Sequence, residues 1–190
     1  MRELALFAGT GMGVYGTGLD TIAYCEVDPY RRKVLQARMR DGLLPTAEVW
    51  PNVKRMVGYM FRDKVDIETG GFPCQAHSLA SHGKANAEDL WPEMLRVIEE
   101  CDARHVFAEN VQRKPIERAA TDLHARGYTC RYARVDASAF GAPHQRERWW
   151  IVAHANEDSK PVCPVHAEAP GMHALAGLDP WSHPPPYGSG

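Results

Sequence analysis

The chain has 190 residues, of which 44% are hydrophobic and 24% are charged, a composition typical of one soluble globular domain rather than a disordered or fibrous chain. Its formal net charge of -2 excludes a strongly basic protein, so any polyanion would have to be held by a local patch. No run approaches the roughly 20 apolar residues of a membrane span, and the N-terminus lacks the layout of a signal peptide. We therefore expect a cytoplasmic protein without a membrane partner.

Six short runs of β-branched and aliphatic residues predict buried strands at residues 4–7, 22–26, 65–69, 105–109, 130–135 and 149–153. Between them, residues 30–39, 90–101 and 116–123 have helical periodicity, with Asp89 as a cap for the second helix and Gly127 ending the third. The alternation of strands and helices predicts an α/β fold with a doubly wound, mostly parallel sheet. Such sheets bind ligands at the carboxyl ends of their strands.

Periodicity ends near Asn156, and prolines become frequent after it. The sequence therefore predicts one domain over residues 1–155 and a Pro-rich tail or linker over residues 156–190, without regular elements. The five cysteines are odd in number and lie in core-like contexts, which argues against a disulfide framework. We predict no metal site, because the spacing of Cys163, His166, His173 and His183 is irregular.

The loop after the first predicted strand is rich in glycine, and its residues are Phe7, Ala8, Gly9, Thr10 and Gly11. Such a loop lets the backbone approach a nucleoside-type ligand closely, although strand ends also use glycine simply to turn. The second strand ends at Glu26, Val27 and Asp28, where a carboxylate commonly binds a ribose. The alternative is a solvated carboxylate that only caps the following helix.

Three further motifs carry chemically useful side chains. Pro73 and Cys74 follow the Gly70-Gly71 pair at a strand end, where a thiolate could attack a bound electrophile. Glu109 ends the next strand, and partial burial would raise its pKa and let it act as an acid. Arg146 and Arg148 lie two residues apart at a strand start, so they point to one side and suit a phosphate or a base carbonyl. For Glu109 the alternative is a turn with a surface Glu. For Arg146 and Arg148 the alternative is a solvated charge cluster.

Taken in order, the segments 7–11, 26–28, 71–75, 109–111 and 146–148 closely resemble the motifs of the C5-cytosine DNA methyltransferases. The resemblance runs from about residue 2 to 154, and its Pro-Cys-Gln and Glu-Asn-Val elements are the most specific. It implies that residues 1–155 form a methyltransferase catalytic domain that binds S-adenosyl-L-methionine through Phe7 to Gly11, with Glu26 on the ribose. Val27, Asn52 and Pro73 would complete that site.

The resemblance also implies a DNA substrate whose cytosine is flipped out of the stack. Cys74 would attack cytosine C6, Glu109 would protonate or hydrogen-bond N3, and Arg148, supported by Arg146, would hold the base O2. C5 could then take the methyl group. Asn110 would orient its neighbours through hydrogen bonds.

The sequence also departs from the family pattern. Ala5 and Met12 replace a usual Asp and Gly, and His144 replaces a usual Gln. The three glycines of residues 13–20 predict a poorly formed first helix, and too few residues follow His154 for a target-recognition region. A split enzyme with a second polypeptide, a catalytically reduced binding module and an unrelated Rossmann oxidoreductase therefore remain alternatives to a self-sufficient methyltransferase.

Overall fold

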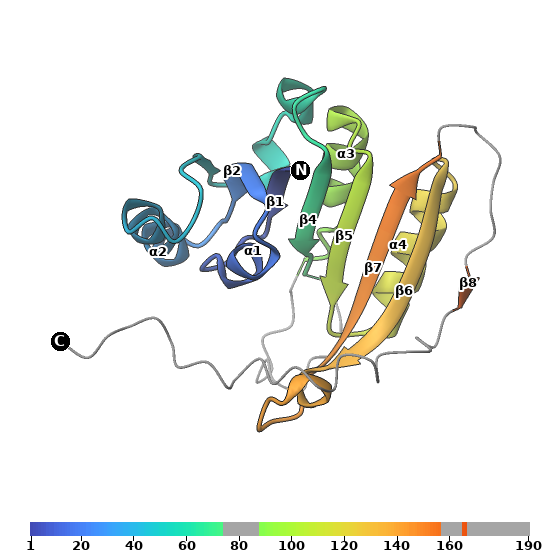
Figure 1. Ribbon diagram of the computed structural model, residues 1–190. Coiled ribbons are helices and arrows are strands. Elements are labelled where there is room, and N and C mark those ends of the chain that lie inside the picture. Colours follow the sequence, from blue (N-terminus) through green and yellow to red (C-terminus); the bar gives the residue numbers. More distant parts are fainter. Residues whose placement is uncertain (74–87, 157–164, 167–190) are drawn as a thin grey trace.

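The computed structural model describes residues 1–73, 88–156 and 165–166. They form one sheet with the strand order β3-β2-β1-β4-β5-β7-β6-β8. Strands β1 to β5 are parallel, whereas β7 runs antiparallel to both β5 and β6 (Figure 1). The bounds are Arg2–Leu6 (β1), Asp20–Cys25 (β2), Glu48–Trp50 (β3), Ile67–Gly71 (β4), His105–Asn110 (β5), Tyr128–Asp136 (β6), Glu147–Ala155 (β7) and Val165–His166 (β8). The predicted α/β, mostly parallel sheet is therefore confirmed.

Helices cover the two faces of this sheet unequally. They are α1 (Met12–Thr17), α2 (Pro29–Arg40), α3 (Trp91–Cys101) and α4 (Arg113–His124), with short 3-10 turns η1 (Val53–Arg55), η2 (Gly58–Phe61) and η4 (Ala137–Phe140). Helices α3 and α4 lie on one side (Figure 1) and bury the larger core. Helices α1 and α2 bury a smaller cluster against β1 and β2 on the other side.

Most predicted elements are confirmed, with bounds that differ from the predicted ones by up to three residues. Strand β3 was not predicted, because it has only three residues. Helix α3 begins at Trp91 instead of Leu90, although Asp89 Oδ1 still accepts a hydrogen bond from the Trp91 N–H at 3.1 Å. Helix α1 does form, but only over six residues between left-handed glycines. The expectation of no regular element after residue 156 is wrong at β8, whose backbone pairs with β6.

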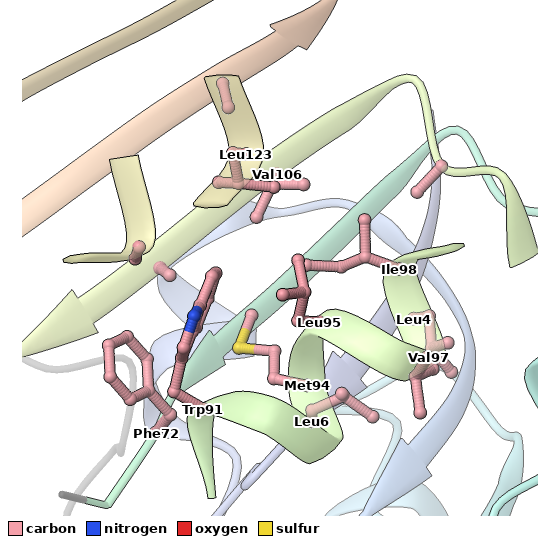
Figure 2. Packing of buried hydrophobic residues seen from close by; sticks show 14 of the residues in the cluster. Leu4, Leu6, Phe72, Trp91, Met94, Leu95, Val97, Ile98, Val106 and Leu123 are labelled. Atoms are coloured by element: carbon pink, nitrogen blue, oxygen red, sulfur yellow. The ribbon is translucent and has the colours of Figure 1, made fainter. Parts of the chain in front are cut away.

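The larger core fixes the segment that leads out of β4. Phe72 and Trp91 are both fully buried, and their ring centroids lie 5.0 Å apart (Figure 2). The Trp91 indole N–H donates to Asp122 Oδ2 at 2.8 Å, so α3 is tied to α4 as well. Because aromatic pairs in a packed core resist displacement, the chain just before Cys74 has a defined position.

Candidate active site

The carboxyl ends of β1, β2, β4 and β5 meet at one edge of the sheet, and the loop after β1 is shaped by left-handed backbone. Phe7, Gly9 and Gly11 have φ values of 51°, 58° and 83°. The Ala8 N–H donates to the Cys25 carbonyl at 3.0 Å, which holds the loop against β2. A left-handed conformation costs about 1–2 kcal/mol for a residue with a side chain, so Phe7 is held in a strained backbone conformation at this strand end.

Gly11 is required for packing as well as for its φ angle. A Cβ at this position would lie 2.5 Å from Leu44 Cδ1 and 2.9 Å from Leu35 Cδ2. Both leucines belong to the smaller core, so their terminal methyl groups would have to shift to admit a larger residue.

Glu26 is buried, with only 3% of its surface exposed, and it organises two backbone segments. Its Oε2 accepts a hydrogen bond from the Gly9 N–H at 2.7 Å, and its Oε1 accepts one from the Asp28 N–H at 2.9 Å. Each carboxylate oxygen can accept a further bond. The helix-capping role belongs to Asp28, whose carboxylate accepts from the backbone of Arg31 and Tyr30, and these bonds lower its pKa.

A cavity of about 440 Å³ opens beside this loop. Five predicted cofactor residues line it, namely Phe7, Glu26, Val27, Asn52 and Pro73, whereas Ala8, Gly9, Thr10 and Gly11 form the neighbouring loop and are not among the lining residues. The lining residues that sequence reasoning missed are Cys25, Arg31, Val53, Lys54, Gly71, Glu88 and Leu90.

The missed residues include an ion pair at the rim of this cavity. Lys54 Nζ lies 2.6 Å from Glu88 Oε1, which joins the turn after β3 to the segment before α3. Asn52 Oδ1 accepts from the Lys54 N–H at 2.9 Å and so begins that turn. Recognising β3 would have pointed to Val53 and Lys54, which follow the predicted Asn52 at the strand end.

Glu109 lies at the end of β5, directly beside Gly71 of β4. Its Oε1 lies 2.8 Å from Arg148 Nε. This contact is an ion pair without hydrogen-bond alignment, since the buried Oε1 accepts no hydrogen bond from the described residues. Burial raises the pKa of Glu109, and the nearby guanidinium groups of Arg148 and Arg146 only partly offset that increase. The raised pKa makes this carboxyl group a better candidate for a proton donor than an exposed glutamate.

Gly71 connects the cavity with this carboxyl group. It lines the cavity, and a Cβ built on it would lie 2.9 Å from Glu109 Oε2. The Glu109 carboxyl group therefore lies over the backbone of Gly71, where a side chain would obstruct it. Proximity of this kind follows from the parallel pairing of β4 and β5.

Arg146 and Arg148 both border a second cavity, of about 490 Å³, on the same side of the sheet as Glu109. This observation agrees with the prediction that the two arginines share one side. Arg148 is largely enclosed, with 22% of its side chain exposed, and it faces Glu109. Arg146 is exposed, and its backbone N–H donates to Asp136 Oδ1 at 3.0 Å.

Cys74 lies outside the described residues, but the residues on either side of segment 74–87 are anchored. The side-chain amide of Asn110 donates to the Phe72 carbonyl at 2.9 Å, and the Leu90 N–H donates to the Pro73 carbonyl at 3.0 Å. The orienting role predicted for Asn110 thus has a visible counterpart, because its amide links the end of β5 to the residues preceding Cys74.

The described cysteines are poor nucleophiles. Burial raises the pKa of Cys25 to about 12 and that of Cys130 to about 11, and it raises the pKa of Cys101 as well. Because the thiolate is the reactive form, these three are core residues, as their sequence context predicted.

A third cavity lies at the opposite edge of the sheet and is not part of this site. Its volume is about 580 Å³, and its lining includes Arg2, Asp66, Arg104 and His154, but none of the predicted site residues. Asp66 is already engaged there by Arg2, whose hydrogen bonds lower the Asp66 pKa to about 2. Size alone would therefore point to the wrong edge.

The ordered motifs and this geometry agree with a sequence comparison. The model of the C-5 cytosine-specific DNA methylase family matches residues 1–174. The chain belongs to this family. Membership in the C-5 cytosine-specific DNA methylases removes the unrelated oxidoreductase from the alternatives. It also implies S-adenosylmethionine as the cofactor.

Several curated type II methyltransferases are similar to the chain. It is 30% identical to the type II methyltransferase M.CviJI of Paramecium bursaria Chlorella virus IL3A, over 80% of this chain and 42% of the relative. It is 33% identical to M.Eco47II of Escherichia coli, over 81% of this chain and 39% of the relative. The chain therefore spans less than half of these two relatives. M.AquIA of Picosynechococcus is 27% identical, and 71% of it is covered.

Solved structures show the same fold. A Spodoptera frugiperda DNMT2 mutant matches 90% of this chain and 56% of its own with a TM-score of 0.66 and 15% identity. A putative DNA modification methyltransferase from an E. coli prophage matches 82% of this chain and 47% of its own length, with a TM-score of 0.61 and 23% identity. At these identities the likeness establishes the methyltransferase fold. In the described part of the chain, no helix is both long enough and apolar enough to cross a bilayer.

The residues present fit the implied cofactor. The buried Glu26 carboxylate, fixed by two backbone N–H groups, can still accept bonds from a ribose. Apolar surface from Phe7, Val27, Val53 and Leu90 lines the same cavity, as an adenine ring and a thioether-like chain would need.

Proposed function

We propose that the protein transfers a methyl group from S-adenosyl-L-methionine to C5 of a flipped cytosine in DNA, through a covalent bond between Cys74 and C6. The relatives come from bacteria and an algal virus, and we place the reaction in the cytoplasm of such a host cell.

In this proposal the 440 Å³ cavity holds the cofactor. Glu26 accepts the ribose hydroxyls, Phe7 and Val27 contact the apolar parts, and Asn52 and Pro73 close the wall. Ala8 to Gly11 bring the backbone close and hold Glu26 in place through the Gly9 N–H. When bound, the cofactor supplies an electrophilic methyl group on a sulfonium.

Cytosine C5 becomes nucleophilic only after addition at C6. The Cys74 thiolate forms the S–C6 bond, and Glu109 donates its proton, or a hydrogen bond, to N3, so that an enamine carbon results at C5. That carbon would take the methyl group supplied by the cofactor that Glu26 and Phe7 would hold, and the cofactor sulfur would keep the bonding electron pair, which leaves S-adenosylhomocysteine. Loss of the C5 proton to a base and of the thiolate from C6 then gives 5-methylcytosine.

The raised pKa of Glu109 suits this role, because a carboxyl group ionised throughout could not donate. Arg148 fixes the carboxyl group from one side at 2.8 Å and would hold the base O2, and Arg146 would support it. The observation that carries the proposal is that Gly71 borders the cavity proposed for the cofactor and also lies beneath Glu109 Oε2. The two proposed sites are therefore adjacent.

Mass spectrometry of nucleosides tests the reaction. DNA incubated with the purified protein and S-adenosylmethionine should contain 5-methylcytosine, and the Cys74→Ser variant should yield none. Absence of 5-methylcytosine with the native chain, even when a second polypeptide is supplied, would contradict the proposal.

A second candidate is a catalytically reduced or split-enzyme subunit that binds cofactor or DNA and needs a partner polypeptide for target recognition. It is favoured by Ala5 and Met12, which replace the Asp and Gly usual in the family pattern. Calorimetry with S-adenosylmethionine distinguishes the two. Cofactor binding without methyl incorporation by the chain alone supports the subunit, and steady turnover by the chain alone excludes it.

A further inference from the structure

The segment between β3 and β4 forms one wall of the 440 Å³ cavity but contains little regular structure of its own. Asn52, Val53 and Lys54 line the cavity, and they form the start of the three-residue turn η1. A second short turn, η2, follows before β4. Because 3-10 turns of this length contain few hydrogen bonds of their own, the position of this wall depends on contacts with the rest of the fold.

Arg96 of α3 makes such contacts with η1. Its Nη2 donates to the Val53 carbonyl at 2.8 Å, and its Nη1 donates to the Met56 carbonyl at 3.0 Å. Val53 is the first residue of η1, and Met56 directly follows its last one. One guanidinium group therefore binds both ends of the turn, through hydrogen bonds that its positive charge strengthens.

Two glutamates of α3 hold this guanidinium group in place. Arg96 Nε donates to Glu93 Oε2 at 3.0 Å, and Nη1 also donates to Glu100 Oε1 at 2.8 Å. The other oxygen of Glu100 accepts from the Gly58 N–H at 2.6 Å, at the start of η2. Gly58 permits this close approach, because a Cβ there would lie 2.9 Å from the Val97 carbonyl oxygen. The planar fork of Arg96 is thus oriented by its own helix.

The residues that precede α3 line the same cavity. Glu88 and Leu90 belong to its lining, and the ion pair of Glu88 with Lys54 joins them to η1 at 2.6 Å. Arg96 itself is not one of the described residues that line the cavity. Its influence on a ligand in the cavity would therefore act through the position of η1.

We infer that Arg96 is a positioning residue for cofactor binding. Its guanidinium group holds η1 so that Asn52, Val53 and Lys54 stand in place as one wall of the cavity before the cofactor arrives. A wall that is already ordered does not have to be ordered by the ligand, and this preorganisation increases affinity. The inference rests on the proposed placement of S-adenosyl-L-methionine in this cavity.

Calorimetry with S-adenosyl-L-methionine and the full chain tests the inference. Arg96→Met keeps an apolar stem of similar length but removes every donor, so it should weaken binding about tenfold or more. Arg96→Lys keeps the positive charge beside Glu93 and Glu100, but one ammonium group does not reproduce a fork on two carbonyls. It should restore most of the urea midpoint and leave the affinity at least about fivefold below native.

The matched control is Arg126→Met. The Arg126 side chain is 36% exposed, against 33% for Arg96. Arg126 likewise pairs with a glutamate of α3, Glu99, and donates to a backbone carbonyl, that of Asp122, at 2.9 Å. Asp122 belongs to α4 and is not one of the described residues that line the cavity, so this variant should bind the cofactor with native affinity.

Three results would overturn the inference. They are native affinity in Arg96→Met, equal weakening in Arg126→Met, and full recovery of affinity in Arg96→Lys together with the urea midpoint, which would make Arg96 a stabilising residue only. Glu26→Gln, measured in the same series, locates the failure. If Glu26→Gln weakens binding and Arg96→Met does not, only the positioning role is wrong, whereas unchanged affinity in both variants contradicts the placement of the cofactor as well.

Kinetics provide a second readout. Because Arg96 contacts no reacting atom in the proposed reaction, Arg96→Met should raise the KM for S-adenosyl-L-methionine about tenfold and change kcat less than about twofold. A fall in kcat with an unchanged KM would contradict the positioning role. The expected binding results without any methyl transfer would support that role and contradict the proposed reaction.

Discussion

Substituting Gly71 with Ala should damage the chemistry while leaving the fold intact. The added Cβ would lie 2.9 Å from Glu109 Oε2, about half an ångström closer than ordinary van der Waals contact. The Glu109 carboxyl group is the flexible end of its side chain, so it would move and lose its 2.8 Å contact with Arg148. Since misplacement by about 1 Å costs on the order of 100-fold in rate, we expect a loss of methyl transfer of about 10-fold to 100-fold.

Stability should change little in this variant, because Gly71 does not have a positive φ and Gly→Ala at a compatible position stabilises by about 0.4–1 kcal/mol. The matched control is Gly16→Ala in α1, where a Cβ meets no atom within 4 Å. It should keep full activity. The assay compares initial rates of labelled methyl incorporation with the urea midpoint of each variant. Native activity in Gly71→Ala, or a loss explained by unfolding, would refute this reasoning.

Three further predictions concern buried polar groups. Glu26→Gln replaces one acceptor oxygen with a donor, so it should lose the hydrogen bond from either the Gly9 N–H or the Asp28 N–H. Calorimetry should then show S-adenosylmethionine binding weakened about tenfold or more. Unchanged affinity would contradict this. Asn110→Asp leaves the Phe72 carbonyl without its donor and should lower the free energy of unfolding by about 1–3 kcal/mol in urea. Burial raises the pKa of Glu68, so native stability should fall as pH rises from the usual carboxyl pKa through the raised one. Glu68→Gln should flatten that fall in thermal melts recorded above the usual carboxyl pKa, and an identical pH profile would count against it.

Local signals in the sequence were sufficient for much of the fold. The four apolar residues of α4 are all buried at the predicted spacing, because the period of a helix relates sequence directly to one face. The motif residues Phe7, Glu26, Asn52 and Pro73 all line one cavity, since the carboxyl ends of parallel strands meet at one edge.

Other features depend on contacts between distant residues and had no local signal. Strand β3 has three residues and gains its order from pairing with β2. The ion pair of Arg148 with Glu109 requires β7 to lie antiparallel beside β5, and neither motif specifies that neighbour. The Lys54–Glu88 pair at the cavity rim likewise joins two loops whose proximity only the folded chain establishes.

Covalent trapping tests the central chemistry most directly. A DNA duplex containing 5-fluorocytosine is incubated with the protein and S-adenosylmethionine, and the intact mass is measured under denaturing conditions. Because fluorine at C5 cannot leave as a proton does, the chain should carry one oligonucleotide and one methyl group, attached at Cys74, and Cys74→Ser should carry none. An unmodified native chain, or an equal adduct on Cys74→Ser, would contradict the mechanism.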